Sequence, residues 1–330
     1  MIDLLSPFSD NSLTIMLFLF FIIPAIFVLV SMPYILPKMQ KEGQLVKDMH
    51  KLNTPCVPTN GGLIILLIAL FSLSILSLFY GKYITPLNYT IIVIIILFAL
   101  FGLLDDMVNI GRPAKLILLY YCSYPLLPFI VSTSINFPFI GSVELSAIYP
   151  QIIIITYVVV VANLVNMHSG LNGLAPGVSL IILATLIIKT LFFGSISNAL
   201  CIICLTGALL GYFWFEKYPS RIFWGNIGAL SIGAAIGATI VTQGFIISGF
   251  IMLIPHTVNF LLYVYWRLNT SRYPIKKFGQ VADDGTLTVP NPLTLKWVLP
   301  YYFRMTETSA TYCMFAVTAI FCIIGFYVQM

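Results

Sequence analysis

Long apolar runs alternate with short polar segments along almost the whole chain. A membrane-crossing helix needs roughly 20 apolar residues, and somewhat shorter runs qualify because helices tilt and end in interfacial residues. Ten runs fit this description: residues 13–36, 62–79, 89–104, 116–131, 152–165, 178–193, 199–215, 227–241, 245–266 and 310–328. The fifth and the eighth fit it least well. The pattern therefore predicts an all-α polytopic membrane protein with about ten transmembrane helices.

The composition supports this class of protein. Hydrophobic residues make up 60% of the 330 residues and charged residues only 8%, whereas soluble domains carry about a quarter charged residues. No internal repeat or low-complexity linker divides the chain, so we expect one integral membrane domain over residues 1–330. The first run has acids instead of a basic segment before it and no small-residue cleavage site, so we expect it to be retained as a helix.

Lysine and arginine residues mark the cytoplasmic side of a membrane protein. With ten spans, fourteen of the sixteen fall on one side of the membrane: Lys38, Lys41, Lys47, Lys51, Arg112, Lys115, Lys217, Arg221, Arg267, Arg272, Lys276, Lys277, Lys296 and Arg304. Only Lys82 and Lys189 fall on the other side. We therefore expect both termini outside the cytoplasm and a cytoplasmic face with nearly all the polar chemistry. The net charge of +5 suits membrane lipids and phosphorylated substrates, and no nucleic acid is needed to explain it.

An aspartate pair is the strongest candidate for chemistry on this face. Asp105 and Asp106 follow directly on an apolar run in FGLLDDMVNIGRPAK (residues 101–115), and Lys115 ends the segment. Carboxylates at the mouth of a membrane helix are costly to place, which favours a functional role. The alternative is a pair that only ends a helix in water.

Asparagines gather in a second polar segment, NLVNMHSGLNGLAPG (residues 163–177). Asn163 and Asn166 lie three residues apart, so they share one helical face, and Asn172 begins a turn. Unpaired amides at a membrane boundary are costly. These side chains are therefore expected either to hydrogen-bond between helices or to act as oxygen ligands and base readers.

The last polar loop contains a second aspartate pair, Asp283 and Asp284, followed by Gly285. Alternating residues flank this sequence, which predicts a small β-hairpin in which the aspartates are structural. The basic residues of the loop either anchor the chain at the membrane or bind a diphosphate: Arg267, Arg272, Lys276 and Lys277.

Four segments together resemble the motifs of the polyprenyl-phosphate N-acetylhexosamine-1-phosphate transferase superfamily. They are KDMHK (residues 47–51), DDMVNIGRPAK (105–115), NLVNMHSGLNGLAPG (163–177) and YPSRIFWGN (218–226). The similarity is strongest to the eukaryotic and archaeal dolichyl-phosphate N-acetylglucosamine-1-phosphotransferase branch. It implies transfer of N-acetylglucosamine-1-phosphate from UDP-N-acetylglucosamine to dolichyl or another polyprenyl phosphate, with release of UMP. This reaction is the first step of lipid-linked oligosaccharide assembly for protein N-glycosylation.

The resemblance also implies roles for single residues. Asn166 would contribute an oxygen to a Mg²⁺ ion, with Mn²⁺ as the alternative metal, and Lys115 would face the diphosphate. Asp105 and Asp106 would orient or deprotonate the lipid phosphate or assist the metal. The substrate-binding candidates are Lys47, Asp48, Asn109, Asn163, Asn172, Phe223 and Arg272, among which Asn172 and Phe223 match positions that read and stack on uracil. A homodimer is left open.

One position departs from the family pattern. The family has an aspartate after the glycine of the fourth motif, where it helps to hold the metal, and this chain has Asn226. An amide offers an oxygen but no charge, so we expect weaker metal binding and weaker catalysis unless Asp105 or Asp106 compensates. The alternative is a slow or inactive member of the family, whether Asn226 is natural or introduced.

Alternatives of other kinds stay open from the sequence. The same reaction with another N-acetylhexosamine, or with undecaprenyl phosphate, would serve cell-wall polymer synthesis. A lipid-linked sugar transporter that moves ions would place ionisable groups near the bilayer midplane, where this chain has almost none. A non-catalytic subunit would turn over only with a second chain. The short loops fit a prokaryotic, archaeal-type plasma membrane better than the endoplasmic reticulum.

Overall fold

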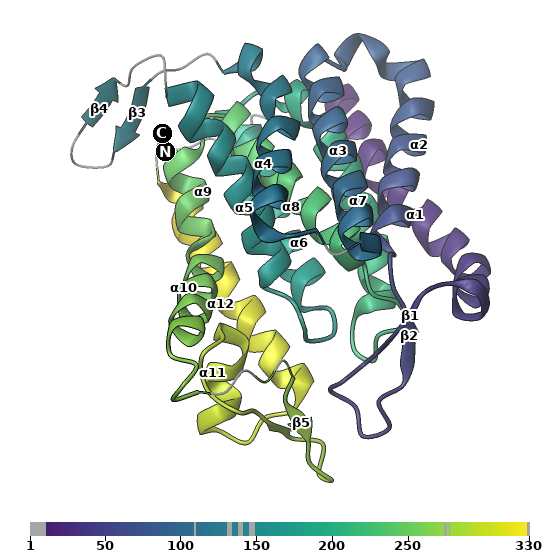
Figure 1. The fold of residues 1–330 in the computed structure, drawn as a ribbon. Helices are drawn as coiled ribbons and strands as arrows, with labels where there is room; N and C mark the ends of the chain where they lie inside the picture. The colour runs from purple at the N-terminus through teal and green to yellow at the C-terminus, as the bar shows by residue number, and fades with distance from the viewer. Residues whose placement is uncertain are drawn as a thin grey trace.

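The computed structural model describes residues 11–108, 110–130, 134–137, 141–144, 149–273, 276 and 278–328. Its α-helices are α1 (Asn11–Glu42), α2 (Gly62–Tyr80), α3 (Pro86–Val108), α4 (Arg112–Cys122), α5 (Ile155–Met167), α6 (Leu174–Phe193), α7 (Leu200–Glu216), α8 (Gly225–Thr242), α9 (Ile246–Met252), α10 (Ile254–Leu268), α11 (Leu295–Tyr302) and α12 (Glu307–Tyr327). The strands form three antiparallel pairs: β1 (Leu45–Lys47) with β2 (Cys56–Pro58), β3 (Ser134–Phe137) with β4 (Gly141–Glu144), and β5 (Gln280–Val281) with β6 (Leu287–Thr288). Figure 1 shows the helices packed side by side, with the hairpins at the two ends of the bundle. The predicted all-α class with small hairpins is confirmed.

The predicted apolar runs coincide with helices, but not every helix is long enough to cross a membrane. Seven segments among the described residues are long and apolar enough to cross a membrane: residues 12–42, 62–83, 86–108, 174–193, 196–216, 225–242 and 307–327. The helices α9 and α10 would add an eighth crossing, bent by 61°, and Pro255 stands at the start of α10, where its missing N–H is tolerated. The fourth and fifth runs form shorter helices: α4 has 11 residues and α5 has 13. The chain is thus an integral membrane protein with seven or eight full-length spans among its described residues.

Helix α8 lies at the centre of the bundle and packs against α2, α3, α5 and α6. Its small residues allow the neighbouring backbones to approach closely. A Cβ atom on Gly233 would lie 2.6 Å from the Cα atom of Ala162, and one on Gly237 would lie 3.0 Å from the Cα atom of Val158. Membrane helices gain contact in this way because lipid supplies no hydrophobic force between them.

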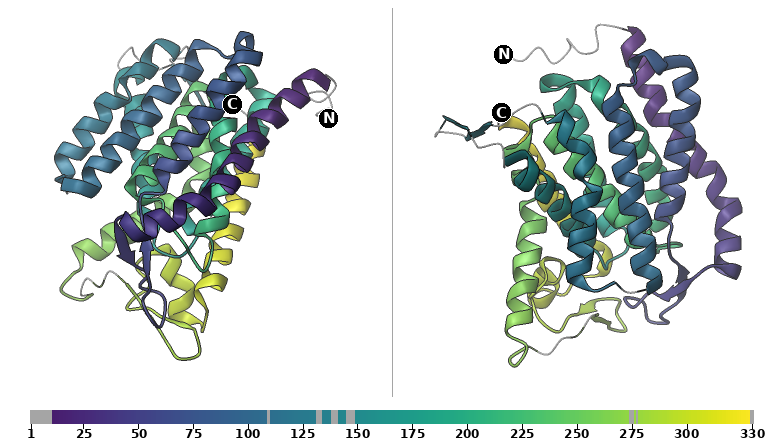
Figure 2. Two further views of the ribbon diagram at one scale, coloured as in Figure 1. Left: turned by 90° about the vertical axis from the view of Figure 1, so that its right-hand side faces the viewer. Right: turned by 45° about the horizontal axis from the view of Figure 1, so that its top comes forward.

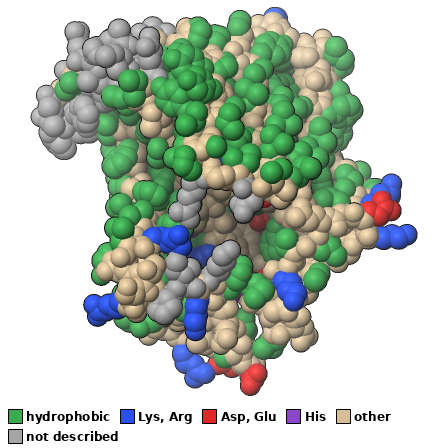
Figure 3. Space-filling model, viewed as in Figure 1, with side chains coloured by type: hydrophobic (Ala, Val, Ile, Leu, Met, Phe, Trp, Pro, Cys, Tyr) green, Lys and Arg blue, Asp and Glu red, His purple; other side chains and the backbone are tan. Residues whose placement is uncertain are grey.

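Charged side chains gather at one end of the bundle. In Figure 3 the upper part of the molecule is mostly apolar, and the Lys and Arg side chains cluster in the lower part. The start of α1 and the end of α12 lie at the opposite end (Figure 2). At that opposite end Lys189 is buried, and its Nζ atom donates to the main-chain oxygens of Phe326 and Val328, both at 2.8 Å. Lys189 therefore caps the end of α12 inside the protein.

Residues 269–306, as far as the structure describes them, form a structure that we call the C-terminal cap. It contains the hairpin of β5 and β6, which the sequence predicted, and α11, which it did not. In the turn, the Oδ1 atom of Asp284 accepts from the main-chain nitrogen of Thr286 at 3.0 Å, and its Oδ2 atom pairs with Arg304 at 2.5 Å. Asp284 is thus engaged within the hairpin and its flanking segment, in agreement with a structural role.

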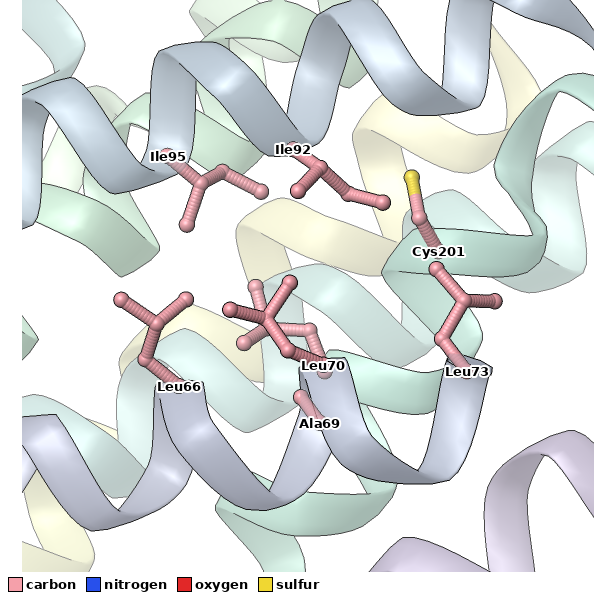
Figure 4. A pocket seen from close by; sticks show the side chains of 8 residues that line it. Leu66, Ala69, Leu70, Leu73, Ile92, Ile95 and Cys201 are labelled. Carbon is pink, nitrogen blue, oxygen red and sulfur yellow. The ribbon is translucent and has the colours of Figure 1, made fainter. Parts of the chain in front are cut away.

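A small apolar cleft lies between α2, α3 and α7. Figure 4 shows aliphatic side chains and Cys201 around it. No charged group lines this cleft. Polar chemistry therefore has to be sought at the charged end of the bundle.

Candidate active site

The aspartate pair and Asn226 meet where α3 ends and α8 begins. The Nδ2 atom of Asn226 donates to Oδ1 of Asp106 at 2.6 Å and to Oδ2 of Asp105 at 3.3 Å. Its main-chain nitrogen also donates to Oδ2 of Asp106 at 3.1 Å. This contact depends on Gly102, one turn earlier in α3, because a Cβ atom there would lie 2.6 Å from the main-chain oxygen of Asn226.

Lys115 completes this cluster from the first turn of α4. Its Nζ atom lies 2.8 Å from Oδ2 of Asp105, and both side chains are largely shielded, with 14% and 12% exposed. Asp105 is therefore paired with Lys115 and also accepts from Asn226, whereas Asp106 is held by Asn226. We call Asp105, Asp106, Lys115 and Asn226 the acidic cluster. On the face shown in Figure 3, a hollow with acidic atoms inside it opens between the apolar and charged parts.

Gly225 shapes the turn that presents Asn226. Its φ angle is +67°, and a Cβ atom would lie 2.8 Å from Oδ1 of Asn60 and 3.2 Å from Oδ2 of Asp106. Only glycine takes this backbone conformation without strain and leaves room for both neighbours. The glycine of the fourth motif is therefore required by geometry.

The first polar loop pairs with the fourth motif through the main chain. The nitrogen of Gly61 donates to the oxygen of Phe223 at 2.9 Å, and the nitrogen of Phe223 donates to the oxygen of Pro58 at 2.8 Å. The buried carboxylate of Glu216, at the end of α7, also holds the fourth motif, since its Oε2 atom accepts from the nitrogen of Trp224 at 2.9 Å. These bonds bring Phe223, which is half-buried, beside the segment that enters α2.

Asn172 forms a second buried polar group, 4% exposed, which joins three polar segments. Its Nδ2 atom donates to Oδ2 of Asp48 at 3.1 Å, and its Oδ1 atom accepts from the main-chain nitrogen of Ser220 at 2.9 Å. Its own main-chain nitrogen donates to Oε1 of Glu307 at 2.6 Å. Lys51 neutralises this group, because its Nζ atom pairs with both Asp48 and Glu307. Both polar atoms of the Asn172 side chain are thus engaged by the protein.

The sequence analysis missed Lys51, Glu307 and Glu216. Lys51 lies inside a quoted motif, and the two glutamates stand at the ends of apolar runs. For the two glutamates, a charge at the edge of an apolar run was the signal that could have identified them, since such charges need a partner when they are buried.

The other predicted site residues are placed less centrally. Asn166 is half-buried at the end of α5, and Asn163 uses its Nδ2 atom to donate to the main-chain oxygen of Val159 at 2.8 Å. Lys47 is exposed on β1. Arg272 is exposed in the C-terminal cap, where its guanidinium lies 5.5 Å from the centre of the Tyr273 ring. Asn109 lies outside the described residues.

Two ionisable groups beside these segments have shifted pKa values. Burial, together with the nearby charge of Lys296, lowers the pKa of His50 to about 4, so the imidazole is neutral at pH 7. Burial also lowers the pKa of Lys296 to about 8, although the charge of Glu307 opposes the shift. Both effects follow from the cost of a charge out of water.

The acidic cluster offers oxygen donors that suit a hard cation. Asp105, Asp106 and the amide oxygens of Asn226 and Asn166 are the ligand types that Mg²⁺ prefers, and Mg²⁺ commonly takes one or two carboxylates together with substrate phosphates and water. Among the described residues no group of three His, Cys, Asp or Glu side chains is arranged to hold a metal ion. These side chains are thus donor types that could hold a Mg²⁺ ion.

Comparison with known proteins identifies the family. A protein of Sulfolobus acidocaldarius is 31% identical over 277 residues, which cover 81% of this chain and 82% of that protein. The profile of glycosyl transferase family 4 matches residues 87–244. The chain belongs to glycosyl transferase family 4. The matched part of this family 4 chain contains the acidic cluster and Asn172, and the predicted superfamily is confirmed.

Other relatives of this family 4 chain carry related names. The Sulfolobus protein is provisionally named a UDP-N-acetylglucosamine–dolichyl-phosphate N-acetylglucosaminephosphotransferase. A protein of Saccharolobus solfataricus with the same name is 31% identical over 304 residues, 90% of this chain and 91% of that protein. A phospho-N-acetylmuramoyl-pentapeptide-transferase of Desulfotalea psychrophila is 30% identical over 223 residues, 58% of this chain and 61% of that protein.

Proposed function

We propose that the protein transfers N-acetylglucosamine-1-phosphate from UDP-N-acetylglucosamine to dolichyl or another polyprenyl phosphate. The products are UMP and a diphosphate-linked lipid sugar, the starting point for lipid-linked oligosaccharides in protein N-glycosylation. The observation that carries the proposal is the acidic cluster, a set of two carboxylates, an amine and an amide at the charged end of a membrane bundle. The names of the two archaeal relatives support the same substrates.

The reaction joins two anionic partners at the membrane surface. An oxygen of the lipid phosphate attacks the β-phosphorus of the nucleotide sugar, a new P–O bond forms, and the bond from that phosphorus to the bridging oxygen breaks. UMP leaves with the electron pair. Charge neutralisation and positioning are the main tasks of an enzyme for phosphoryl transfer.

Each residue of the acidic cluster has a role in this proposal. Lys115 neutralises phosphate oxygens while it holds Asp105 in place. Asp106, fixed by Asn226, orients the lipid phosphate and takes its proton when the phosphate arrives as a monoanion. Mg²⁺, or Mn²⁺ in its place, would be held by Asp105, Asp106, Asn166 and Asn226. When bound, the ion would supply positive charge to the diphosphate.

The position of the site in the cell is part of the proposal. The charged end of the bundle would face the cytoplasm, since lysine and arginine mark that side, and UDP-sugars would reach the site from there. The archaeal relatives support a prokaryotic plasma membrane as the location.

A second candidate is the same reaction with another N-acetylhexosamine or with undecaprenyl phosphate. The match to the bacterial phospho-N-acetylmuramoyl-pentapeptide-transferase favours keeping it, although that match covers a smaller part of the chain than the archaeal ones. Detergent-purified protein given Mg²⁺ and dolichyl phosphate should release UMP from UDP-N-acetylglucosamine faster than from UDP-N-acetylgalactosamine or UDP-N-acetylmuramoyl-pentapeptide. Faster release from either competitor would assign the sugar differently.

A further inference from the structure

The connection between α5 and α6 carries several of the polar residues discussed above. We call residues 166–173 the asparagine loop, since it begins with Asn166 and contains Asn172. Gly170 and Gly173 adopt φ angles of +105° and +68°. One bond inside the loop runs from Oγ of Ser169 to the oxygen of Asn166 at 3.0 Å, and further contacts come from the segments that surround the loop.

Three helices, α10, α11 and α12, each contribute one side chain that forms a hydrogen bond with the main chain of this loop. The Nδ2 atom of Asn259 in α10 donates to the oxygen of Met167 at 3.2 Å. The Nζ atom of Lys296 in α11 donates to the oxygen of Ser169. The carboxylate of Glu307 in α12 accepts from the nitrogen of Asn172 at 2.6 Å.

Two of these side chains, Asn259 and Glu307, are themselves held in place. Asn259 is 3% exposed, and its Oδ1 atom accepts from the main-chain nitrogen of Leu295 at 2.9 Å, so one amide ties the start of α11 to the end of α5. Glu307 is 3% exposed and pairs with Lys51. Removing either partner would leave buried polar atoms unpaired, which makes such contacts costly to break.

Apolar packing joins the asparagine loop to the same region. Leu171, on one side of Asn172, and Leu174, two residues after it, are buried in a hydrophobic cluster separate from the main core of the bundle. The other buried members of this cluster are Val178, Trp266, Leu287, Val289, Leu293, Trp297, Ala310 and Met314. The C-terminal cap therefore contacts the loop with both its polar and its apolar side chains.

We propose that Asn259, Lys296 and Glu307 are positioning residues, which set the conformation of the asparagine loop and through it the binding of the nucleotide sugar. The proposal rests on the proposed function for its substrate, and it adds a role for the C-terminal cap. None of the three needs to touch the substrate. A displacement of about 1 Å at a reacting group can cost about a hundredfold in rate.

The test compares Lys296→Met with Arg304→Met in purified full-length protein. Both variants lose one cation of the C-terminal cap, but Arg304 pairs with Asp284 in the hairpin and is 84% exposed. Lys296→Met should lower kcat/KM for UDP-N-acetylglucosamine by about tenfold to a hundredfold and leave KM for the lipid phosphate unchanged. Arg304→Met should keep the wild-type values of both. Equal effects of the two substitutions, or a loss that only follows a smaller folded fraction, would overturn the proposal.

A second pair of variants separates an effect on the position of the asparagine loop from an effect on the stability of the whole protein. Glu307→Gln keeps an oxygen that can accept from Asn172, and Lys51 keeps Asp48 as a partner at 3.2 Å. Glu307→Ala removes the acceptor. We expect Glu307→Gln to retain most of the kcat/KM that Glu307→Ala loses, and a failure of this rescue would contradict a role for the hydrogen bond.

Hydrogen–deuterium exchange tests the positioning without reference to activity. Amides of residues 166–173 should exchange faster in Lys296→Met and Glu307→Ala than in Arg304→Met, while amides of α8 should not change. Unchanged exchange in the asparagine loop would overturn the positioning role. If the wild-type protein failed to use UDP-N-acetylglucosamine while the exchange changed as expected, the substrate would be wrong and the positioning role would stand.

Discussion

Replacing Asn226 by aspartate tests how the acidic cluster is held together. The amide nitrogen of Asn226 donates to Asp106 at 2.6 Å and to Asp105 at 3.3 Å, and an aspartate cannot make these bonds. Hydrogen bonds to charged groups contribute roughly 1.5–3 kcal/mol each, and two like charges 4 Å apart cost about 4 kcal/mol at an effective dielectric constant of 20. Uptake of a proton by one carboxyl limits the repulsion.

We therefore expect Asn226→Asp to lose about 3 kcal/mol of stability in the absence of divalent cations. For a protein of this size the melting temperature would fall by roughly 4 °C. Mg²⁺ should restore the melting temperature of the variant and raise that of the wild type less, because three carboxylates attract the ion more strongly than two carboxylates and an amide. The assay is thermal unfolding in detergent with EDTA and with a series of Mg²⁺ concentrations.

Asn291→Asp is the matched control. Asn291 is 2% exposed in the C-terminal cap, and its Oδ1 atom accepts from the nitrogen of Leu293 at 2.9 Å, a bond that an aspartate can keep. Because this variant keeps the wild-type acidic cluster, Mg²⁺ should raise its melting temperature only as much as it raises that of the wild type. If Asn226→Asp melted like the wild type in EDTA, or if its response to Mg²⁺ matched that of Asn291→Asp, our account of the cluster would be refuted.

Three further predictions concern activity and pH. Asp105→Ala, Asp106→Ala and Lys115→Ala should each reduce UMP release about a hundredfold or more, comparable to losing one preorganised electrostatic group in other enzymes; a near wild-type rate would remove that residue from its role. Asp284→Ala should leave the rate nearly unchanged, and a loss as large as for Asp105 would show that the wrong aspartate pair was assigned. His50 has a pKa of about 4 when folded and about 6.5 when unfolded. Because the unfolded state binds the extra proton between these values, stability should fall by about 3 kcal/mol as the pH drops from 6.5 to 4. His50→Asn should weaken this dependence in thermal unfolding, and an unchanged pH profile would contradict it.

The sequence predicted the membrane class and the apolar helices because hydrophobicity is a local property. Run length alone could not show that the fourth and fifth runs form helices of 11 and 13 residues. It also could not show that α8, which has one of the two apolar runs that fit a membrane span least well, is the most buried of the described spans, with 83% of its 18 residues inside the protein. Its glycines and alanines lower the apparent hydrophobicity, and the same small residues allow the close packing.

The members of the acidic cluster were predictable, because Asp105, Asp106 and Lys115 share one polar segment and the resemblance of the fourth motif to the family pointed to Asn226. The contacts of Asn172 were not predictable, because they join residues as far apart as Asp48 and Glu307. The same holds for Lys296, whose contact with Ser169 exists only after the C-terminal cap has folded against the asparagine loop. Pairings across the whole chain depend on tertiary packing, and a local pattern contains no information about them.

The most direct test of the central claim follows the β-phosphate of UDP-N-acetylglucosamine. Purified protein is incubated with dolichyl phosphate, Mg²⁺ and nucleotide sugar labelled at the β-phosphorus, and the lipid and water-soluble products are separated. Our account predicts that the label enters the lipid fraction in step with UMP release, and that Asp106→Ala abolishes both. Label that stays in the water phase as UDP would show transfer of the sugar without its phosphate and would contradict the account.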